Sequence, residues 1–529
     1  MKKGGPLVDY LLPAWPSGID RFERDPIVNL AQLFNTRGHS AMLLLLQEAP
    51  WLRYQLHTNG LAGMPWWSAF DALQDVAATD GLPWSFADLT WPDAPRGVIQ
   101  YPLYGPHGVT MMRDDRPWAA VQFAMGGFVA AVQWFAADGY CLQKDTYDDR
   151  GFLTTSTWYT SAGTETKKEW FTPMGTVAVT AAAGAVTVNA EWAAKLGRPT
   201  FTDLDHLVLA VAAWYLTAQP GGHLVVPADH PLLSQAAPLT QHHPLVVLQS
   251  TEMRQADFIE PSDHFAHTVV VPTQRTAAVI RQSAKPKAAV RVPAVQVIPP
   301  FAAELRLGES TELSTVTLYW RVGAQPAPDR LAVIAPILVN ILAAAPERQI
   351  VIDCASDRDA QTVVLAWLTA LARTIGVAPD SAEFQALQAL PPGTDSVSEP
   401  AALTDTHRDS AQSILKRCRI AVAPALAEIE ADLQKTRLVV DLADTPDLFV
   451  QIAAISAGLP QINRAVTGFV QDHQNGLVIT ADDQLADALD YYLATFTHWD
   501  EAVVACVDRL DGYAADQLLK TWEEVLRDD

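Results

Sequence analysis

Two pairs of histidines are the side chains that first suggest a metal site. His242 and His243 are neighbours, and His264 and His267 lie farther along the chain. Zinc sites in proteins combine histidines with Cys or acidic ligands at characteristic spacings. Here the pairs lack both such partners and the spacing of a helical zinc motif. We therefore interpret them as surface or capping histidines and expect no metal.

Motifs for nucleophilic and phosphate chemistry are missing from the sequence. It contains no Gly-x-Ser-x-Gly elbow and no Gly-Lys-[Ser/Thr] phosphate loop. After its first apolar run the chain reads PAWPSGIDRFERD, without the glycines that cradle a dinucleotide pyrophosphate. The sequence therefore predicts neither a hydrolase nor an ATPase, and it predicts no cofactor.

A helix predicted to begin near Asp447 offers another candidate site, because the N-terminal end of a helix attracts anions. Its free N–H groups and its dipole both favour a bound phosphate. Asp444 and Asp447 lie at this end of the helix, and their carboxylates would repel a diphosphate. We interpret both as capping residues.

The elements around these residues begin with a β-α-β pattern of Rossmann type. Residues 27–37 have a helical pattern between two apolar runs, and Asp203 or Asp205 caps a later helix that ends near residue 217. The predicted strands of this first lobe are residues 8–12, 41–46, 223–226, 244–249 and 267–272. Residues 295–300, with two prolines, end the lobe in a stiff hinge.

Between the two parts of this lobe the pattern changes to short aromatic and β-branched segments. Turn signals such as Gly126-Gly127, Asp138-Gly139 and Ala162-Gly163 separate them at the spacing of an antiparallel meander. We predict six or seven inserted strands. Their aromatic side chains could stack on sugars or cover a partner, but most are expected to fill the buried face of the sheet.

A second α/β unit begins near Ser314. Its strand candidates are residues 315–320, 349–355, 420–425, 437–443 and 476–480, and its helix candidates are residues 329–345, 357–374, 426–435 and 447–457. Such alternation predicts a parallel, doubly wound sheet. Residues 377–410 lack periodicity and are expected to form a loop excursion or a mobile insertion, whereas the end of the chain has a helical pattern.

The four predicted segments are residues 1–96 and 196–305 for the first lobe, 97–195 for the inserted sheet, and 306–529 for the second lobe with its C-terminal helices. A chain of this length is expected to divide into several domains. The fold class is therefore α/β, with two Rossmann-like lobes and an antiparallel β-meander inserted in the first.

Charge and composition limit the partners. The formal net charge is −23, which disfavours nucleic acid. The four cysteines are widely separated and are expected to be reduced and buried. No signal peptide or membrane-spanning run is predicted, so we expect a cytoplasmic protein. One cationic stretch, Arg281 to Arg291, could touch an anionic lipid surface, although a solvated loop is the preferred interpretation.

Several short sequences together resemble a known family. They are LLPAW near the start of the chain, LRYQLHTNGL at 52–61, WWSAFDALQDV at 66–76, DDRGFL at 148–153 and PDLFVQIAAISAGLPQIN at 446–463. The chain resembles the first accessory secretion protein (Asp-one) of the accessory Sec system of Gram-positive bacteria. This family has a GT-B glycosyltransferase-like fold.

The resemblance to GT-B enzymes implies a degenerate donor site. Retaining enzymes of this kind carry two glutamates, eight positions apart, that hold the sugar nucleotide. The matching positions here are Thr445 and Ala453. The resemblance also implies an Arg and Lys phosphate clamp, for which Arg321 and Arg330 are imperfect candidates. The implied vestigial donor or carbohydrate cleft comprises Asp444, Thr445, Ala453, Gly458, Leu459, Pro460 and Gln461.

The function that this resemblance implies is export. The chain is expected to be a non-catalytic component of a complex with two sister accessory secretion proteins and an accessory SecA-type motor ATPase. That complex helps a glycosylated serine-rich-repeat adhesin reach the accessory translocon, at the inner face of the cell membrane, and the chain could bind the adhesin's sugars or polypeptide. The alternative is an active retaining glycosyltransferase that modifies serine residues or protein-linked sugar with a UDP-sugar donor.

Overall fold

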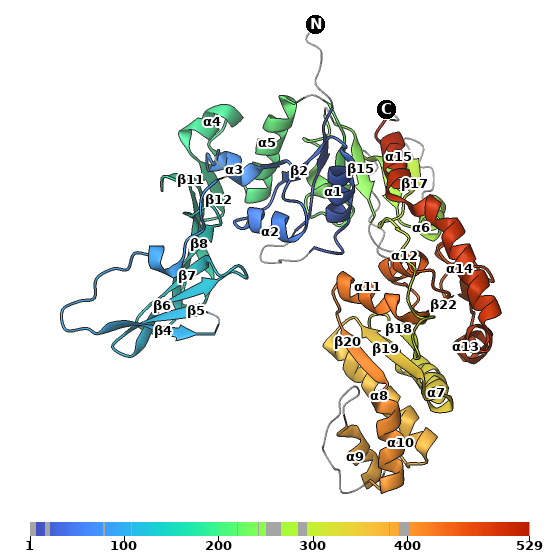
Figure 1. Ribbon diagram of the computed structural model, residues 1–529. Coiled ribbons are helices and arrows are strands. Elements are labelled where there is room, and N and C mark those ends of the chain that lie inside the picture. Colours follow the sequence, from blue (N-terminus) through green and yellow to red (C-terminus); the bar gives the residue numbers. More distant parts are fainter. Residues whose placement is uncertain are drawn as a thin grey trace.

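The computed structural model describes residues 7–15, 22–77, 80–106, 108–219, 221–241, 243–249, 266–283, 294–379, 381–390 and 403–527. Within them the chain forms three sheets, of seven, ten and six strands. The seven-stranded and six-stranded sheets are the cores of two lobes. The ten-stranded sheet projects sideways from the first lobe (Figure 1).

The sheet of the first lobe is parallel and has the order β17-β16-β15-β14-β1-β2-β3. Its strands are β1 Asp9–Leu11, β2 Ala41–Leu45, β3 Trp66–Ser68, β14 Leu224–Pro227, β15 Leu245–Leu248, β16 Ala266–Val271 and β17 Ala294–Val297. β1 pairs in parallel with both β2 and β14, as the buried apolar runs predict. β17 pairs with β16, so part of the segment predicted as a hinge is an edge strand.

The inserted sheet is an antiparallel meander whose order follows the sequence. Its strands are β4 Gln100–Gly105, β5 Gly108–Arg113, β6 Arg116–Phe123, β7 Val129–Phe135, β8 Cys141–Asp148, β9 Phe152–Tyr159, β10 Glu165–Phe171, β11 Val177–Ala182, β12 Ala185–Val188 and β13 Thr200–Phe201. The prediction of six or seven strands is therefore too low. One missed turn is Asp114-Asp115, which takes positive φ without glycine.

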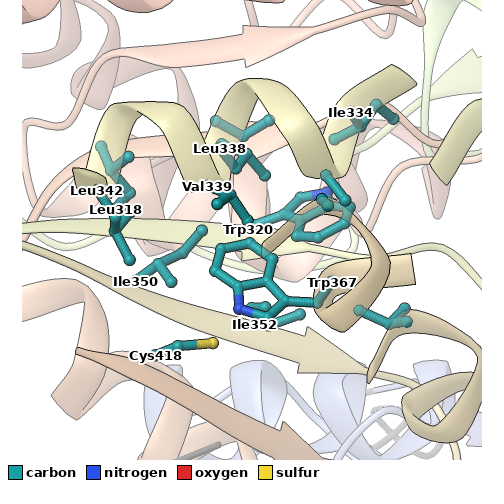
Figure 2. Packing of buried hydrophobic residues seen from close by; sticks show 14 of the residues in the cluster. Leu318, Trp320, Ile334, Leu338, Val339, Leu342, Ile350, Ile352, Trp367 and Cys418 are labelled. Carbon is teal, nitrogen blue, oxygen red and sulfur yellow. The ribbon is translucent and has the colours of Figure 1, made fainter. Parts of the chain in front are cut away.

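The second lobe contains a parallel sheet of order β20-β19-β18-β21-β22-β23. Its strands are β18 Val316–Arg321, β19 Arg348–Cys354, β20 Cys418–Val422, β21 Thr436–Asp441, β22 Gln461–Asn463 and β23 Gly476–Val478. The five predicted strands are confirmed, and the short β22 was missed. Trp320 and Trp367 fill the core between this sheet and its helices, together with leucines and isoleucines (Figure 2).

Helices cover both lobes. Those of the first lobe and the meander are α1 Pro26–Arg37, α2 Leu52–Thr58, α3 Ala69–Leu73, η1 Phe86–Asp88, α4 Ala190–Leu196, α5 Leu204–Thr217, η2 Leu233–Gln235 and α6 Gln274–Ser283. The others are α7 Pro328–Ala344, α8 Asp357–Ile375, α9 Ala382–Gln388, α10 Asp405–Leu415, α11 Leu426–Gln434, α12 Leu448–Ser456, η3 Asp482–Gln484, α13 Leu485–Leu493, α14 Phe496–Leu510, η4 Asp511–Tyr513 and α15 Ala515–Val525.

Two of these helices correct the interpretation of residues 377–410 as a loop excursion. α9 and α10 lie in this region, and each starts at a side-chain cap, Ser381 for α9 and Thr404 for α10. α9 is short, and the apolar residues that α10 buries come at its end, which explains the weak periodicity of the sequence. Residues 391–402 lie outside the described residues.

The last helix returns to the first lobe. Trp522 of α15 contacts Phe34 of α1 edge to face, with ring centroids 6.1 Å apart. Leu518 and Val525 join the same core. The end of the chain therefore packs against its beginning, and the domain boundaries drawn from the sequence stay a prediction.

Candidate functional site

The candidate site lies at the carboxyl ends of the strands in the second lobe, where open α/β sheets bind their ligands. Arg321 is the last residue of the central strand β18. It is paired in register with Asp353, near the end of β19, and with Asp441, the last residue of β21. Three neighbouring strands thus place one aspartate on each side of the Arg321 guanidinium.

Carboxylates occupy the hydrogen-bonding edge of Arg321. Its Nη1 lies 2.6 Å from Asp353 Oδ1, and its Nη2 lies 3.2 Å from Asp447 Oδ2. Tyr319 also donates to Asp353, at 2.6 Å. Although burial opposes the charge of Arg321, the neighbouring Asp353 and Asp447 raise its pKa. A phosphate would have to compete with these internal partners for the guanidinium.

The N-terminal end of α12 is occupied in the same way. The Asp447 carboxylate accepts hydrogen bonds from the N–H groups of Phe449 and Val450, at 3.1 and 3.4 Å. Its own N–H donates to Asp441 Oδ2 at 2.9 Å. The prediction that Asp447 caps this helix is confirmed. The N–H groups that could bind a diphosphate are therefore bonded to the chain's own carboxylate.

Arg330, the second candidate for a phosphate clamp, is also bound. Its Nε and Nη2 each lie 2.7 Å from an oxygen of Asp482, and Nη2 donates to the carbonyl of Leu442 at 2.6 Å. The hydrogen bonds from Arg330 lower the pKa of Asp482. Both arginines picked from the sequence are therefore paired with acidic side chains.

The first lobe closes over this edge through the loop before α1. Arg24 Nη1 lies 2.7 Å from Asp447 Oδ2, and Glu23 accepts from the N–H of Leu426, the first residue of α11, at 3.0 Å. From α6, Arg275 donates to the carbonyl of Asp444 at 3.1 Å. Side chains from the first lobe thus bind at the N-terminal ends of two helices in the second.

The predicted cleft residues divide into two groups. Asp444 and Thr445 are exposed in the loop between β21 and α12, and Asp444 lines a pocket of about 570 Å³ with residues 464–468 and Arg275. Asp444 does not cap the helix; its carboxylate lies 3.7 Å from Arg330. The assignment of Thr445 to a vestigial donor site stays a prediction.

The other predicted residues pack inside the lobe. Ala453 is half-buried against the core of α11 and α12. Gly458 has φ +70°, and a Cβ there would lie 2.8 Å from Leu307 Cδ2. Leu459, Pro460 and Gln461 are buried, and the Gln461 amide donates to the carbonyl of Gln451 at 2.9 Å. Their assignment to a vestigial cleft stays a prediction.

The sequence reasoning missed Glu23, Arg24, Asp353, Asp441 and Asp482. For Asp353 and Asp441 a signal was present, because each is a carboxylate at the end of a buried apolar strand. Such a residue needs a partner at the sheet edge. For Arg24 the sequence held no signal, since its partner lies 423 positions away.

The DDRGFL sequence joins the meander to the first lobe. Asp149 accepts from Arg53 Nε at 2.9 Å and from the N–H of Tyr54 at 3.0 Å. Arg150 forms ion pairs with Asp148, at 2.6 Å, and with Asp71, at 2.7 Å. Burial raises the pKa of Asp148 to about 6 despite its bonds to Arg150. The turn between β8 and β9 is thus anchored by charged groups with little access to solvent.

Within the described part of the chain, no group of three or more His, Cys, Asp or Glu side chains could hold a metal ion. His243 is buried, with its ring nitrogens 3.0 and 3.3 Å from the carbonyls of Gly222 and Leu216, so the interpretation as a surface or capping residue is wrong for it. His242 and His264 lie outside the described residues, as does the side chain of His267.

The other sequence interpretations have mixed outcomes. The cysteines are free, and three are buried while Cys141 is half-exposed. Lys285, Lys287 and Arg291 of the cationic stretch lie outside the described residues. Among the helices that are described, none combines the length and apolar character needed to span a membrane.

Comparisons with known proteins agree with this architecture. The family model described as Accessory Sec system protein Asp-one matches residues 10–529. A protein of that name from Streptococcus gordonii is 24% identical over 97% of this chain and 95% of its own length.

Two solved structures share the fold over nearly the full length of both chains. One is the complex of accessory secretory proteins 1, 2 and 3 of Streptococcus pneumoniae, with a TM-score of 0.71, 20% identity and 98% of each chain covered. The other is the pneumococcal O-GlcNAc transferase GtfA in complex with UDP and GlcNAc, with a TM-score of 0.68, 12% identity and again 98% of each chain covered. The GT-B-like fold is thereby confirmed. The chain belongs to the Asp-one family of accessory Sec system proteins.

Proposed function

We propose that the chain is a non-catalytic component of a cytoplasmic accessory Sec export complex, and that it helps a glycosylated serine-rich-repeat adhesin reach the translocon. The observation that carries this proposal is the ion-paired edge of the second lobe. Arg321 and Arg330 are bound by carboxylates, and Asp447 caps the helix that would hold a diphosphate. Thr445 and Ala453 supply no carboxylate for the ribose or the sugar.

The rival function, sugar transfer from a UDP-sugar, needs groups that stabilise the charge on the leaving diphosphate. Here an added diphosphate would meet the carboxylates of Asp353 and Asp447, which already bind the Arg321 guanidinium. It would also have to displace Arg24 of the first lobe from Asp447. These contacts disfavour binding of a UDP-sugar, even though the GT-B-like fold is kept.

Donor binding and turnover test the proposal directly. The purified chain is incubated with a radiolabelled UDP-sugar, with and without a serine-rich peptide, and its melting temperature is recorded. A ligand at 100 times its Kd would add about 2.7 kcal/mol of stability. We expect no transfer, no hydrolysis and no thermal shift.

Two variants distinguish true turnover from a contaminant. Thr445→Trp places bulk at the exposed edge, whereas Thr187→Trp places the same bulk at an exposed position of the meander strand β12. Turnover that survives purification, and is lost only in Thr445→Trp, would show that the donor site works and would refute the proposal.

The partners are proposed from the family and its relatives. The pneumococcal relative was solved as a complex of accessory secretory proteins 1, 2 and 3. We expect this chain to co-purify with two sister proteins and, through them, to engage the SecA-type motor ATPase and the adhesin. A monodisperse monomer that binds neither sister protein on co-expression would contradict this assignment.

A further inference from the structure

A cavity of about 740 Å³ lies between the first lobe and the meander. One wall is formed by the loops that follow β2 and β14, residues 46–51 and 230–232. The other wall is formed by the meander strands β6 to β10. The carboxyl ends of parallel strands are the usual ligand side of such sheets, and this volume is typical of small-molecule sites.

The meander wall is a polar face made by neighbouring strands. Lys144 of β8 pairs in register with Thr157 of β9, which pairs in turn with Lys168 of β10. Since alternate residues of a strand share a face, Thr146 and Tyr159 lie on the same side of the sheet. All five line the cavity.

Several lining groups hold the two walls together. Lys168 Nζ lies 2.6 Å from Glu48 Oε1, so it joins the meander to the loop after β2. Trp51 donates from its indole N–H to the carbonyl of Tyr147 at 3.2 Å, which fixes the indole ring. Burial lowers the pKa of His230 to about 4, so this ring is neutral at physiological pH, and its Nδ1 accepts from the N–H of Leu232 at 3.1 Å.

Other lining groups are left for a ligand. In the part of the chain that the structure describes, the side chains of Gln122, Lys144, Thr146 and Glu165 make no hydrogen bond or ion pair with the protein. Together they present an amide, an ammonium, a hydroxyl and a carboxylate to the cavity. This set offers both donors and acceptors.

The charges of the cavity nearly balance. Three carboxylates, those of Glu48, Glu165 and Asp205, face two ammonium groups, those of Lys144 and Lys168. A phosphate-bearing ligand would gain no net attraction, and a purely apolar ligand would leave the polar groups desolvated and unpaired. A neutral ligand rich in hydroxyl groups satisfies both requirements.

We propose that this cavity binds a neutral sugar, as a hexose or N-acetylhexosamine unit, with its hydroxyl groups bonded to Lys144 and Thr146 of β8. The aromatic rings of Trp51 and Tyr159, which also line the cavity, supply apolar surface for the sugar face. This inference rests on the proposed function, since it assigns the recognition of a glycosylated substrate to the meander side of the first lobe.

Binding of defined sugars to the full-length chain tests the site. The probes are the methyl glycosides of N-acetylglucosamine, glucose and galactose, a serine-rich peptide carrying N-acetylglucosamine, and the same peptide without sugar. Saturation-transfer NMR and calorimetry measure the affinities. We expect at least one glycoside to bind, the glycopeptide to bind if its sugar matches, and the bare peptide not to bind.

A matched pair of variants locates the binding. Lys144→Met removes the free ammonium but keeps the aliphatic stem. Lys167→Met makes the same change on the opposite face of β10, where Lys167 pairs with Glu169 at 2.8 Å. Loss of one charge-assisted hydrogen bond should weaken sugar binding at least about tenfold in Lys144→Met and leave Lys167→Met unchanged.

The remaining outcomes overturn the inference. They are equal affinity of the bare peptide and the glycopeptide, an affinity for sugar that Lys144→Met does not change, and no sugar binding by a chain whose melting temperature shows that it is folded. Co-purification with the sister proteins is scored separately. A chain that assembles with them but binds no sugar would refute the sugar site and leave the proposed function standing.

Discussion

Asp441 provides a test of how the candidate site holds its charges. This carboxyl is buried at the end of β21, and burial raises its pKa to about 7, although the N–H groups of Asp447 and Ala443 donate to it. The substitution Asp441→Asn removes the titration and keeps one acceptor oxygen. The new amide has a single acceptor oxygen and cannot accept from both N–H donors. We therefore also expect a loss of stability that does not depend on pH.

The sign of the pH dependence follows from the two pKa values. The folded-state value, about 7, lies above the ordinary value of 3.8, so between them the folded state binds the proton more tightly. Stability is therefore greatest at low pH and falls as pH rises through about 7. The whole difference corresponds to about 4 kcal/mol, of which about 3 kcal/mol falls between pH 5 and pH 8.

The assay compares melting temperatures of the wild type and Asp441→Asn by calorimetry between pH 5 and pH 8. The melting temperature of the variant relative to that of the wild type should rise by several degrees between pH 5 and pH 8. Asp444→Asn is the matched control, because the side chain of Asp444 is exposed, and its difference from the wild type should stay flat. A constant difference for Asp441→Asn across this range would refute the assignment of a protonated carboxyl at the site.

Two further predictions concern the anchor of the meander. Gly151→Ala should lower the free energy of unfolding by at least about 2 kcal/mol, because φ is +86° and a Cβ would lie 2.2 Å from the carbonyl of Leu82. The control Gly139→Ala, at φ +90° with open space around it, should cost less. Equal losses of stability in the two melting curves would contradict the packing argument. Arg150→Met leaves Asp148 and Asp71 without their cation and should cost about 3 to 5 kcal/mol near pH 8. Because the pKa of Asp148 is about 6, this carboxyl is mostly protonated at pH 5 and needs its cation less, so the loss of stability should be smaller there. A calorimetric loss that is the same at pH 5 and pH 8 would contradict this prediction.

The sequence predicted the order of the elements well because parallel strands leave a strong pattern. Runs such as residues 315–320 and 437–443 are apolar on both faces, as the buried β18 and β21 require. The meander was undercounted for a related reason. Asp114-Asp115 makes a tight turn without glycine or proline, so the turn signals used to count strands did not include it.

The tryptophan side chains of the described residues are largely covered by other groups. Trp214, at 42%, is the one tryptophan among the large exposed apolar side chains of the described residues. Trp91, just before the meander, and Trp118 and Trp134 on it pack against one another in edge-to-face and tilted arrangements, with ring centroids 5.5 to 5.9 Å apart. These rings fill the face of the sheet, as the less specific interpretation of the aromatic side chains predicted.

The proposed absence of donor carboxylates rests on local sequence, whereas the contacts between the two lobes could not be predicted from it. Thr445 and Ala453 are identified by their distance from the Gly458-Leu459-Pro460 segment alone. One of these contacts is made by Arg24, which reaches Asp447 from the other lobe. No local sequence pattern predicts such a pair.

The contacts of Asp447 also decide what would be needed to restore a donor site. A buried guanidinium without a partner is strongly destabilising, so Arg321 requires Asp353 and Asp447 as long as no ligand is bound. Returning glutamates at positions 445 and 453 would supply contacts for the ribose and the sugar, but it would leave Asp447 on the N-terminal end of α12 and Arg24 bound to it. The diphosphate would still meet an occupied helix end. Under the proposed function, the residues at positions 445 and 453 are therefore only one of two barriers to donor binding.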